Sequence, residues 1–239
     1  MAGRRKRVKA ADVMSYLEPL YGPVEWEPRY NPAEELVYTI LSQHTSDINS
    51  ERAFLNLMDT FKTLDRIADA EVEDIEVAIR SGGLSNQKSV RIKEVLNIVR
   101  ADVRSFDLSF LGEMPLEEAK SWLKSLPGVG PKTAAIILCF SLGMPAMPVD
   151  THIYRVSQRL RLIGPKVSAD KAHDILEPMV SEDEVFAFHV YLIRHGRQVC
   201  KAQRPRCDEC VLAWGCPSKG KVGNKTAKRR RKQSAKTAR

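Results

Sequence analysis

The feature of this sequence that most constrains its fold is a group of four cysteines near the C-terminal end. They fall within seventeen residues with the spacing C-x6-C-x2-C-x5-C, at Cys200, Cys207, Cys210 and Cys216. Four thiolates this close in sequence can surround one metal centre without long-range folding, and soft sulfur ligands favour zinc or iron–sulfur. Zinc sites usually pair their ligands in two short C-x2-4-C units, whereas the flanking gaps here are six and five residues. The spacing therefore favours a [4Fe–4S] cluster over zinc, and structural or disulfide-bonded cysteines are the third interpretation.

Length and composition indicate a folded chain of one or two domains. With 239 residues, of which 43% are hydrophobic, the chain can bury a sizeable core. The N-terminal residues are basic and include no apolar segment, so we expect no secretory signal. No stretch reaches the roughly 18 apolar residues of a membrane-spanning helix, so we expect no membrane partner. Unbridged cysteines suit a reducing compartment, and the sequence thus predicts an intracellular protein rather than a secreted one.

The positive charge of the chain is concentrated at its two ends. Residues 1–10 carry five Lys or Arg and residues 217–239 carry ten, with no acidic residue in either segment. Subtracting these fifteen charges from the net charge of +8 leaves −7 for residues 11–216. Both ends lack apolar periodicity, so we expect disordered basic arms that reach phosphates and strengthen nucleic-acid binding. A solubilising tail or a nuclear-localisation signal is the alternative.

The body of the sequence predicts an all-α fold. Residues 34–44, 53–61 and 92–99 place apolar side chains on one helical face each, and no alternating strand pattern of useful length occurs. Asn31-Pro32 is a plausible helix start, because proline is well tolerated in the first turn. Glycines and prolines separate the expected helices at four places: Gly82-Gly83, Leu126-Pro127-Gly128, Gly143 and Gly164-Pro165.

One of these breaks has the character of an anion site. It has the sequence Leu-Pro-Gly-Val-Gly-Pro-Lys-Thr-Ala over residues 126–134. Gly128 and Gly130 allow the backbone to approach a ligand closely. The next helix is expected to begin near Pro131, so its unpaired N–H groups would face a phosphate. An ordinary tight turn is the alternative, but the full string resembles the helix-hairpin-helix of DNA-repair proteins.

A second break follows directly and includes Asp150. This residue has the features of an N-cap for a helix over Thr151–Leu162, and most aspartates in that position are caps only. However, Asp150 lies eighteen residues after Lys132, at the opposite end of one buried helix and its return loop. We therefore expect the two side chains to face the same cleft.

Together these motifs resemble the endonuclease III family, the iron–sulfur branch of the helix-hairpin-helix DNA glycosylases, over about residues 30–216. The resemblance also covers three further segments: residues 40–47, 83–88 and 195–197. It implies two helical domains with a DNA cleft between them. A six-helix barrel with the hairpin would span 25–144, and an iron–sulfur cluster domain would combine 11–24 with 145–216. A cytoplasmic (nucleoid-associated) or nuclear location would follow.

The chemistry that the resemblance implies agrees with the residue types present. Such enzymes rotate a damaged nucleotide out of the duplex. Breaking its glycosidic bond builds positive charge on the sugar, which Asp150 would stabilise. Lys132 would attack the sugar as a neutral amine, a form that partial burial in a cleft favours, and leave a Schiff base. β-Elimination would then nick the strand, although a solvated surface lysine is the alternative for Lys132.

Other positions are assigned by the same resemblance. Leu84 matches the apolar wedge that enters the duplex, and His44 occupies the position of an inserting glutamine, with Gln43 just before it. Which of Gln43 and His44 inserts is left open; Leu84 as a helix-packing residue and His44 as a satisfied histidine are the alternatives.

Further residues complete the expected site. Three cations of the cysteine loop, Lys201, Arg204 and Arg206, would meet phosphates. We expect Cys139 to be buried packing. We expect structural roles for His152, His189 and His195.

Three hypotheses of function remain from the sequence. The first is a monomeric glycosylase with AP lyase activity that removes oxidised pyrimidines from double-stranded DNA. The second is the same class of enzyme acting on another base, such as uracil or a mismatched thymine. The third is a protein that binds damaged DNA without chemistry, which Lys132 and Asp150 together disfavour because phosphate binding needs neither.

Overall fold

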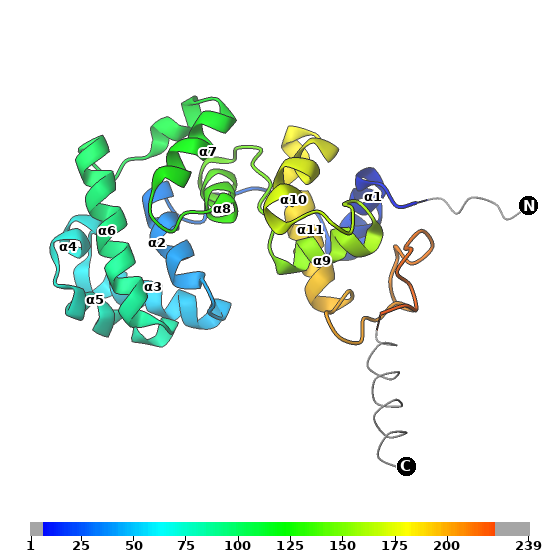
Figure 1. The fold of residues 1–239 in the computed structure, drawn as a ribbon, viewed down its shortest axis with the longest axis horizontal. Helices are drawn as coiled ribbons and strands as arrows, with labels where there is room; N and C mark the ends of the chain where they lie inside the picture. The colour runs from blue at the N-terminus through cyan, green and yellow to red at the C-terminus, as the bar shows by residue number, and fades with distance from the viewer. Residues whose placement is uncertain (1–6, 223–239) are drawn as a thin grey trace, which may run out of the picture. The chain divides into compact units, whose positions relative to one another are not determined.

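A computed structural model describes residues 7–222 of the chain. The predicted all-α fold is confirmed, since the described residues form helices and no strand (Figure 1). Most of the two predicted basic arms, residues 1–6 and 223–239, lies outside the described residues. Within the described part of the first arm, Val8 is buried and the first helix begins at Ala10. No helix in residues 7–222 is long and apolar enough to cross a membrane.

The chain forms two compact units. The hairpin unit is Trp26–Pro148, and the cysteine unit consists of Met1–Glu25 and Val149–Arg239, of which residues 7–25 and 149–222 are described. The hairpin unit has an apolar core of its own, and the cysteine unit buries apolar residues such as Val13, Leu17, Ile153 and Phe188.

The hairpin unit consists of consecutive helices. In chain order they are α2 (Pro32–Ser42), α3 (Asp47–Phe61), α4 (Leu64–Asp69), α5 (Val72–Ala78), η1 (Arg80–Gly82), α6 (Ser85–Val103), η2 (Ser109–Glu113), α7 (Leu116–Ser125) and α8 (Pro131–Leu142). The helical faces that the sequence predicts are buried, with Leu36 and Ile40 of α2 packed in one cluster with Leu57, Ile92 and Ile137. Helix α2 contacts both α3 and α8, so it forms the centre of this unit.

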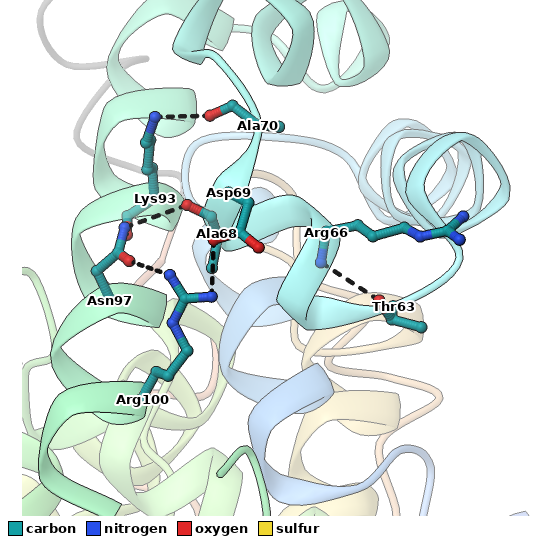
Figure 2. A network of polar contacts seen from close by, with 8 residues as sticks. All are labelled: Thr63, Arg66, Ala68, Asp69, Ala70, Lys93, Asn97 and Arg100. Carbon is teal, nitrogen blue, oxygen red and sulfur yellow. Dashed lines mark hydrogen bonds and ion pairs between the residues drawn. The ribbon is translucent and has the colours of Figure 1, made fainter. Parts of the chain in front are cut away.

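Side chains satisfy the start of α2 and the end of α4 in this unit. The predicted start of α2 is confirmed, because Asn31 accepts a hydrogen bond of 2.9 Å from the Glu34 N–H and Pro32 follows it. Two carbonyls at the C-terminal end of α4 are capped from α6: Lys93 donates to Ala70 O at 2.6 Å and Asn97 donates to Ala68 O at 3.3 Å (Figure 2). Orphan carbonyls at a helix end need such donors, so these bonds fix α4 on α6.

A buried ion pair holds the start of the hairpin unit. Glu35 of α2 is fully buried, and Arg29 reaches it with two hydrogen bonds, one of them 3.0 Å from Nε to Oε2. The Arg29 guanidinium also lies 4.4 Å from the Tyr38 ring centre and 5.0 Å from that of Phe140. Burial raises the pKa of Glu35, and the bonds from Arg29 and Thr39 oppose that rise.

The cysteine unit is built from four α-helices, two short 3-10 turns and a loop, within its described residues. They are α1 (Ala10–Tyr21), α9 (Thr151–Leu160), α10 (Ala169–Leu176), η3 (Glu177–Met179), η4 (Glu182–Glu184) and α11 (Val185–Gln198). The predicted helix 151–162 ends two residues earlier because Arg161 takes a left-handed backbone conformation, with φ of 64°. Helix α11 packs on α9 at Gly196, where a Cβ atom would stand 2.9 Å from the Cβ of His152. Only glycine therefore allows this close helix crossing.

Candidate active site and cysteine cavity

The predicted hairpin connects α7 to α8 in the hairpin unit. Leu126 and Val129 are buried and anchor the turn, while Gly128 and Gly130 are exposed. Gly128 has φ of 73°, and a Cβ there would lie 3.1 Å from Nη1 of Arg91, so this position requires glycine. Helix α8 begins at Pro131 as predicted, and its N-cap Gly130 supplies no side-chain cap. Its first N–H groups thus remain available for an anion.

Lys132 lies in the first turn of α8. The partial burial expected for it is wrong for the chain without DNA, because Lys132 is exposed and the buried face of α8 begins at Thr133. Cys139 lies further along the same helix and is buried, as predicted. The amine of Lys132 is therefore open to a ligand.

Asp150 belongs to the cysteine unit and is partly buried. The predicted N-cap is confirmed: its Oδ1 accepts a hydrogen bond of 2.7 Å from the Ile153 N–H. Capping by one oxygen holds the carboxylate at a fixed place at the start of α9. That the carboxylate also takes part in a reaction stays a prediction.

Helix α9 connects this carboxylate to the cysteine loop through two arginines that sequence reasoning missed. Arg155 donates to Gly196 O at 2.8 Å and to Cys200 O at 3.0 Å. Arg159 donates to Lys201 O at 2.7 Å and Ala202 O at 2.9 Å, and its own carbonyl accepts from Ser218 Oγ at 3.0 Å. In the sequence, the only indication of this pair is the spacing of four residues, which places both side chains on one face of a helix.

The four cysteines line one cavity together with residues of α9 and α11, with a volume of about 410 Å³ that includes its open mouth. All four are free, so the disulfide interpretation is wrong. Arg159 Nη1 lies 3.4 Å from Cys200 Sγ, and His195 Nε2 lies 3.4 Å from Cys210 Sγ.

The electrostatics of this cavity disfavour bare thiolates. Burial and the other three cysteines raise the pKa of Cys210 to about 11, and burial likewise raises the pKa of Cys216. Burial lowers the pKa of His195 to about 4, so its imidazole is neutral and fits the structural role expected for it. A sulfur-only donor set around one cavity fits an iron–sulfur cluster. Among residues 7–222, no three Cys, His, Asp or Glu side chains are close enough to hold one metal ion directly.

The candidate inserting residues lie on two exposed loops of the hairpin unit. His44 and Leu84 are both exposed and both left-handed, with φ of 55° and 51°. Leu84 is 49% exposed, so it is not the helix-packing residue of the alternative. Gln43 donates to Gly128 O at 3.5 Å, which brings its loop against the hairpin. Lys88, known from the sequence only as part of a motif, lies buried beneath both loops.

The basic residues of the cysteine loop are accessible. Lys201, Arg204 and Arg206 are all exposed, and Arg206 lies 3.4 Å from Glu209. Arg204 adopts φ of 50°, so the loop backbone is constrained at this residue.

Comparison with known proteins defines the class of this protein. Residues 37–181 match the HhH-GPD superfamily of base excision DNA repair proteins. The chain belongs to this superfamily, and it is a base-excision-repair DNA glycosylase.

The relatives confirm the family recognised in the motifs. Endonuclease III of Thermotoga maritima is 35% identical over 203 residues, which cover 82% of this chain and 90% of the relative. Endonuclease III of Escherichia coli is 32% identical over 192 residues, covering 80% and 86%. A solved structure of an endonuclease III trapped as a covalent intermediate with DNA matches with a TM-score of 0.74 and 28% identity, covering 88% of this chain and 96% of that chain.

Proposed function

We propose that this glycosylase removes oxidised pyrimidines from double-stranded DNA and then nicks the strand through a Schiff base on Lys132. The observation that carries the proposal is the position of Lys132, an exposed amine in the first turn of α8, two residues after Gly130. An amine beside N–H groups that bind a DNA phosphate lies near the sugars of the bound strand, where it can act as a nucleophile. The trapped endonuclease III–DNA intermediate supports covalent chemistry in a relative of the same fold.

The hairpin and the carboxylate have separate parts in this reaction. The N–H groups at the start of α8 bind a DNA phosphate and set the register of the strand. The damaged nucleotide turns out of the stack, and its C1′–N bond breaks with the bond electrons leaving on the base. Positive charge develops on the sugar at that moment, and the carboxylate of Asp150, fixed by its bond to Ile153, stabilises it.

Lys132 carries out the second part. Its lone pair forms a bond to C1′ and the sugar ring opens, which leaves an imine between C1′ and Nζ. Loss of a proton from C2′ then expels the phosphate on C3′, and the strand is cut 3′ to the lesion. Attack needs a neutral amine, and because Lys132 is exposed in the free chain, bound DNA has to supply the desolvation.

We further propose that Cys200, Cys207, Cys210 and Cys216 hold a [4Fe–4S] cluster. Support comes from four free thiols that lie within seventeen residues of sequence and line one cavity. A cluster held by these four cysteines would order the loop that presents Lys201, Arg204 and Arg206 to DNA phosphates. We propose a monomer that works wherever chromosomal DNA lies, in the cytoplasm with the nucleoid or in the nucleus.

Borohydride trapping tests the proposal. The purified chain would be incubated with duplexes that contain thymine glycol, dihydrouracil, uracil, a T·G mismatch or an abasic site. We expect a covalent adduct that maps to Lys132 and forms fastest on an oxidised pyrimidine. Lys132→Gln should abolish it, whereas Lys124→Gln, which removes another exposed lysine beside the hairpin, should not.

The other outcomes are distinct. Fastest trapping on uracil or on the T·G mismatch would replace oxidised pyrimidines by the second class of substrate. Base release without any adduct would leave a glycosylase without the lyase step. Unchanged nicking by Lys132→Gln would overturn the assignment of this residue.

A further inference from the structure

One buried ammonium joins the two loops that expose His44 and Leu84. Lys88 of α6 is only 5% exposed. Its Nζ donates to three acceptors: Leu41 O at 2.7 Å, Thr45 Oγ1 at 2.6 Å and Gly82 O at 2.9 Å. These three bonds use all the protons of the ammonium, and the acceptors lie 47, 43 and 6 residues away along the chain.

Two of the three acceptors, the carbonyls of Leu41 and Gly82, lie at the ends of two helices. Leu41 lies in the last turn of α2 and Gly82 is the last residue of η1, so both carbonyls belong to the unpaired end of a helix. A cation is favoured there by the helix dipole. None of the three acceptors is a carboxylate, and burial lowers the pKa of Lys88. A buried charge without a counter-ion is costly unless its protons are hydrogen-bonded, as all three are here.

Thr45 and Gly82 tighten the connection between the loops. The Thr45 hydroxyl, which accepts from Lys88, lies 2.5 Å from Gly82 O and 3.1 Å from Gln43 O, either of which can take its proton. A Cβ atom on Gly82 would stand 3.0 Å from Cβ of Ala53, so this backbone is packed firmly against α3. Loop 43–45 is therefore hydrogen-bonded to the carbonyl of Gly82, which directly precedes loop 83–84.

Each loop exposes one side chain in a conformation that non-glycine residues rarely adopt. His44 lies between two residues of the polar network, and Leu84 lies two residues after Gly82. Leu84 is also the N-cap of α6, and its carbonyl accepts from the Lys88 N–H at 3.0 Å. Left-handed backbone at such residues persists only where the surroundings impose it, and functional sites are a common location.

We propose that Lys88 is a positioning residue that fixes His44 and Leu84 as one rigid pair, so that both enter the duplex together when the damaged nucleotide turns out. This inference rests on the proposed function of the same site. Lys88 acts through the two loops and touches neither the DNA nor the reacting sugar. Its loss should impair nucleotide extrusion from a paired duplex more than it impairs overall folding or phosphate binding.

The chain offers a matched control on the same helix. Lys93 of α6 also donates to a carbonyl beyond a helix end, Ala70 O at 2.6 Å, but this bond serves α4 (Figure 2). Lys93→Met therefore removes a similar bond without touching either loop. Thr45→Val is the milder second variant, because it deletes the shared hydroxyl and leaves the charge in place.

The experiment compares Lys88→Met, Thr45→Val, Lys93→Met and wild type in two measurements. Amide hydrogen exchange of the DNA-free chain should show faster exchange at residues 42–46 and 82–85 in the first two variants only. Single-turnover base release should fall roughly 10- to 100-fold in Lys88→Met on a paired lesion, because a misplacement of about 1 Å costs this much. On the same lesion placed opposite an abasic analogue, where no pair has to be broken, the loss should be much smaller.

Coupling to Leu84 decides between positioning and a general structural role. In a Leu84→Ala background, Lys88→Met should cause a clearly smaller loss of base release than it causes in wild type, because one of the two side chains that it positions is gone. Full additivity, or unchanged exchange in both loops of Lys88→Met and Thr45→Val, would overturn the inference. Wild type that acts on none of the duplexes would refute the proposed function, and with it the role in extrusion. An active wild type with an unaffected Lys88→Met would refute the inference alone.

Discussion

Replacing Arg29 by methionine tests whether a paired, buried carboxylate holds the start of the hairpin unit. Glu35 is 0% exposed and the side chain of Arg29 is 37% exposed. Methionine keeps an apolar stem, so the changes are the loss of the charge, of its hydrogen bonds and of the guanidinium contacts with Tyr38 and Phe140. Glu35 would keep only its bond from Thr39, at 3.2 Å.

Removing one partner of a buried pair costs about 3–5 kcal/mol. Partial exposure of Arg29 places this pair near the lower end, at about 3 kcal/mol. For a unit of this size that corresponds to a fall in Tm of about 10 °C. The double variant Arg29→Met/Glu35→Gln carries no buried charge, and it should recover about 2 kcal/mol of the loss because a neutral amide costs less to bury than a carboxylate.

The dependence on pH follows from the direction of the pKa shift. The pKa of Glu35 is already raised by burial, and without Arg29 it rises further. A folded state with a raised carboxyl pKa binds more protons than the unfolded state, so stability falls as pH rises through that interval. The deficit of Arg29→Met should therefore be small near pH 4, roughly the ordinary pKa of glutamate, and larger at pH 8.

Urea unfolding followed by far-UV circular dichroism measures the free energy of unfolding of each variant at pH 4 and pH 8. The Glu35→Gln single variant completes the double-mutant cycle. A deficit that is equal at the two pH values would show that lost packing, rather than an unpaired carboxylate, causes the destabilisation. Absence of any coupling between Arg29 and Glu35 would refute the reasoning as well.

Three further substitutions test the site and the packing. Asp150→Asn should keep the Tm, because asparagine caps a helix equally well. Its single-turnover base release should fall roughly 100-fold or more while its DNA affinity is retained. A loss of DNA affinity instead would point to a binding role for Asp150. Gly128→Ala should weaken DNA binding by roughly tenfold in a fluorescence-anisotropy titration. The reason is that φ of 73° and the nearby Arg91 side chain both oppose a Cβ at this position. Unchanged affinity would show that this turn is not a phosphate site. Gly196→Ala should lower stability by about 1–3 kcal/mol in urea unfolding, because its Cβ would stand 2.9 Å from that of His152; a neutral effect would mean that α9 and α11 separate freely.

Local patterns were enough to predict much of this molecule. The apolar faces, the start of α2 at Asn31-Pro32 and the cap at Asp150 are confirmed, because each depends on residues within one or two helical turns. The grouping of the four cysteines around one cavity could also be predicted locally, because they lie within seventeen residues of sequence.

Long-range contacts to the backbone were out of reach. Two of the three acceptors of Lys88 are backbone carbonyls, and they lie on two different helices. Every residue carries such a carbonyl, so the sequence does not reveal which ones accept a bond. Arg155 and Arg159 likewise bind carbonyls more than forty residues away. The exposure of Lys132 differed from expectation for another reason, because burial in a cleft is a property of the DNA complex as well as of the chain.

The contacts of Arg159 also bear on how this protein can change over time. Its guanidinium binds the backbone at Lys201 and Ala202, and its carbonyl accepts from Ser218, so one residue of α9 anchors both ends of the cysteine loop. The segment between these anchors can therefore vary in length and composition without moving α9 or the carboxylate at its start. Over evolution, this loop can therefore change while the helix that carries Asp150 keeps its place.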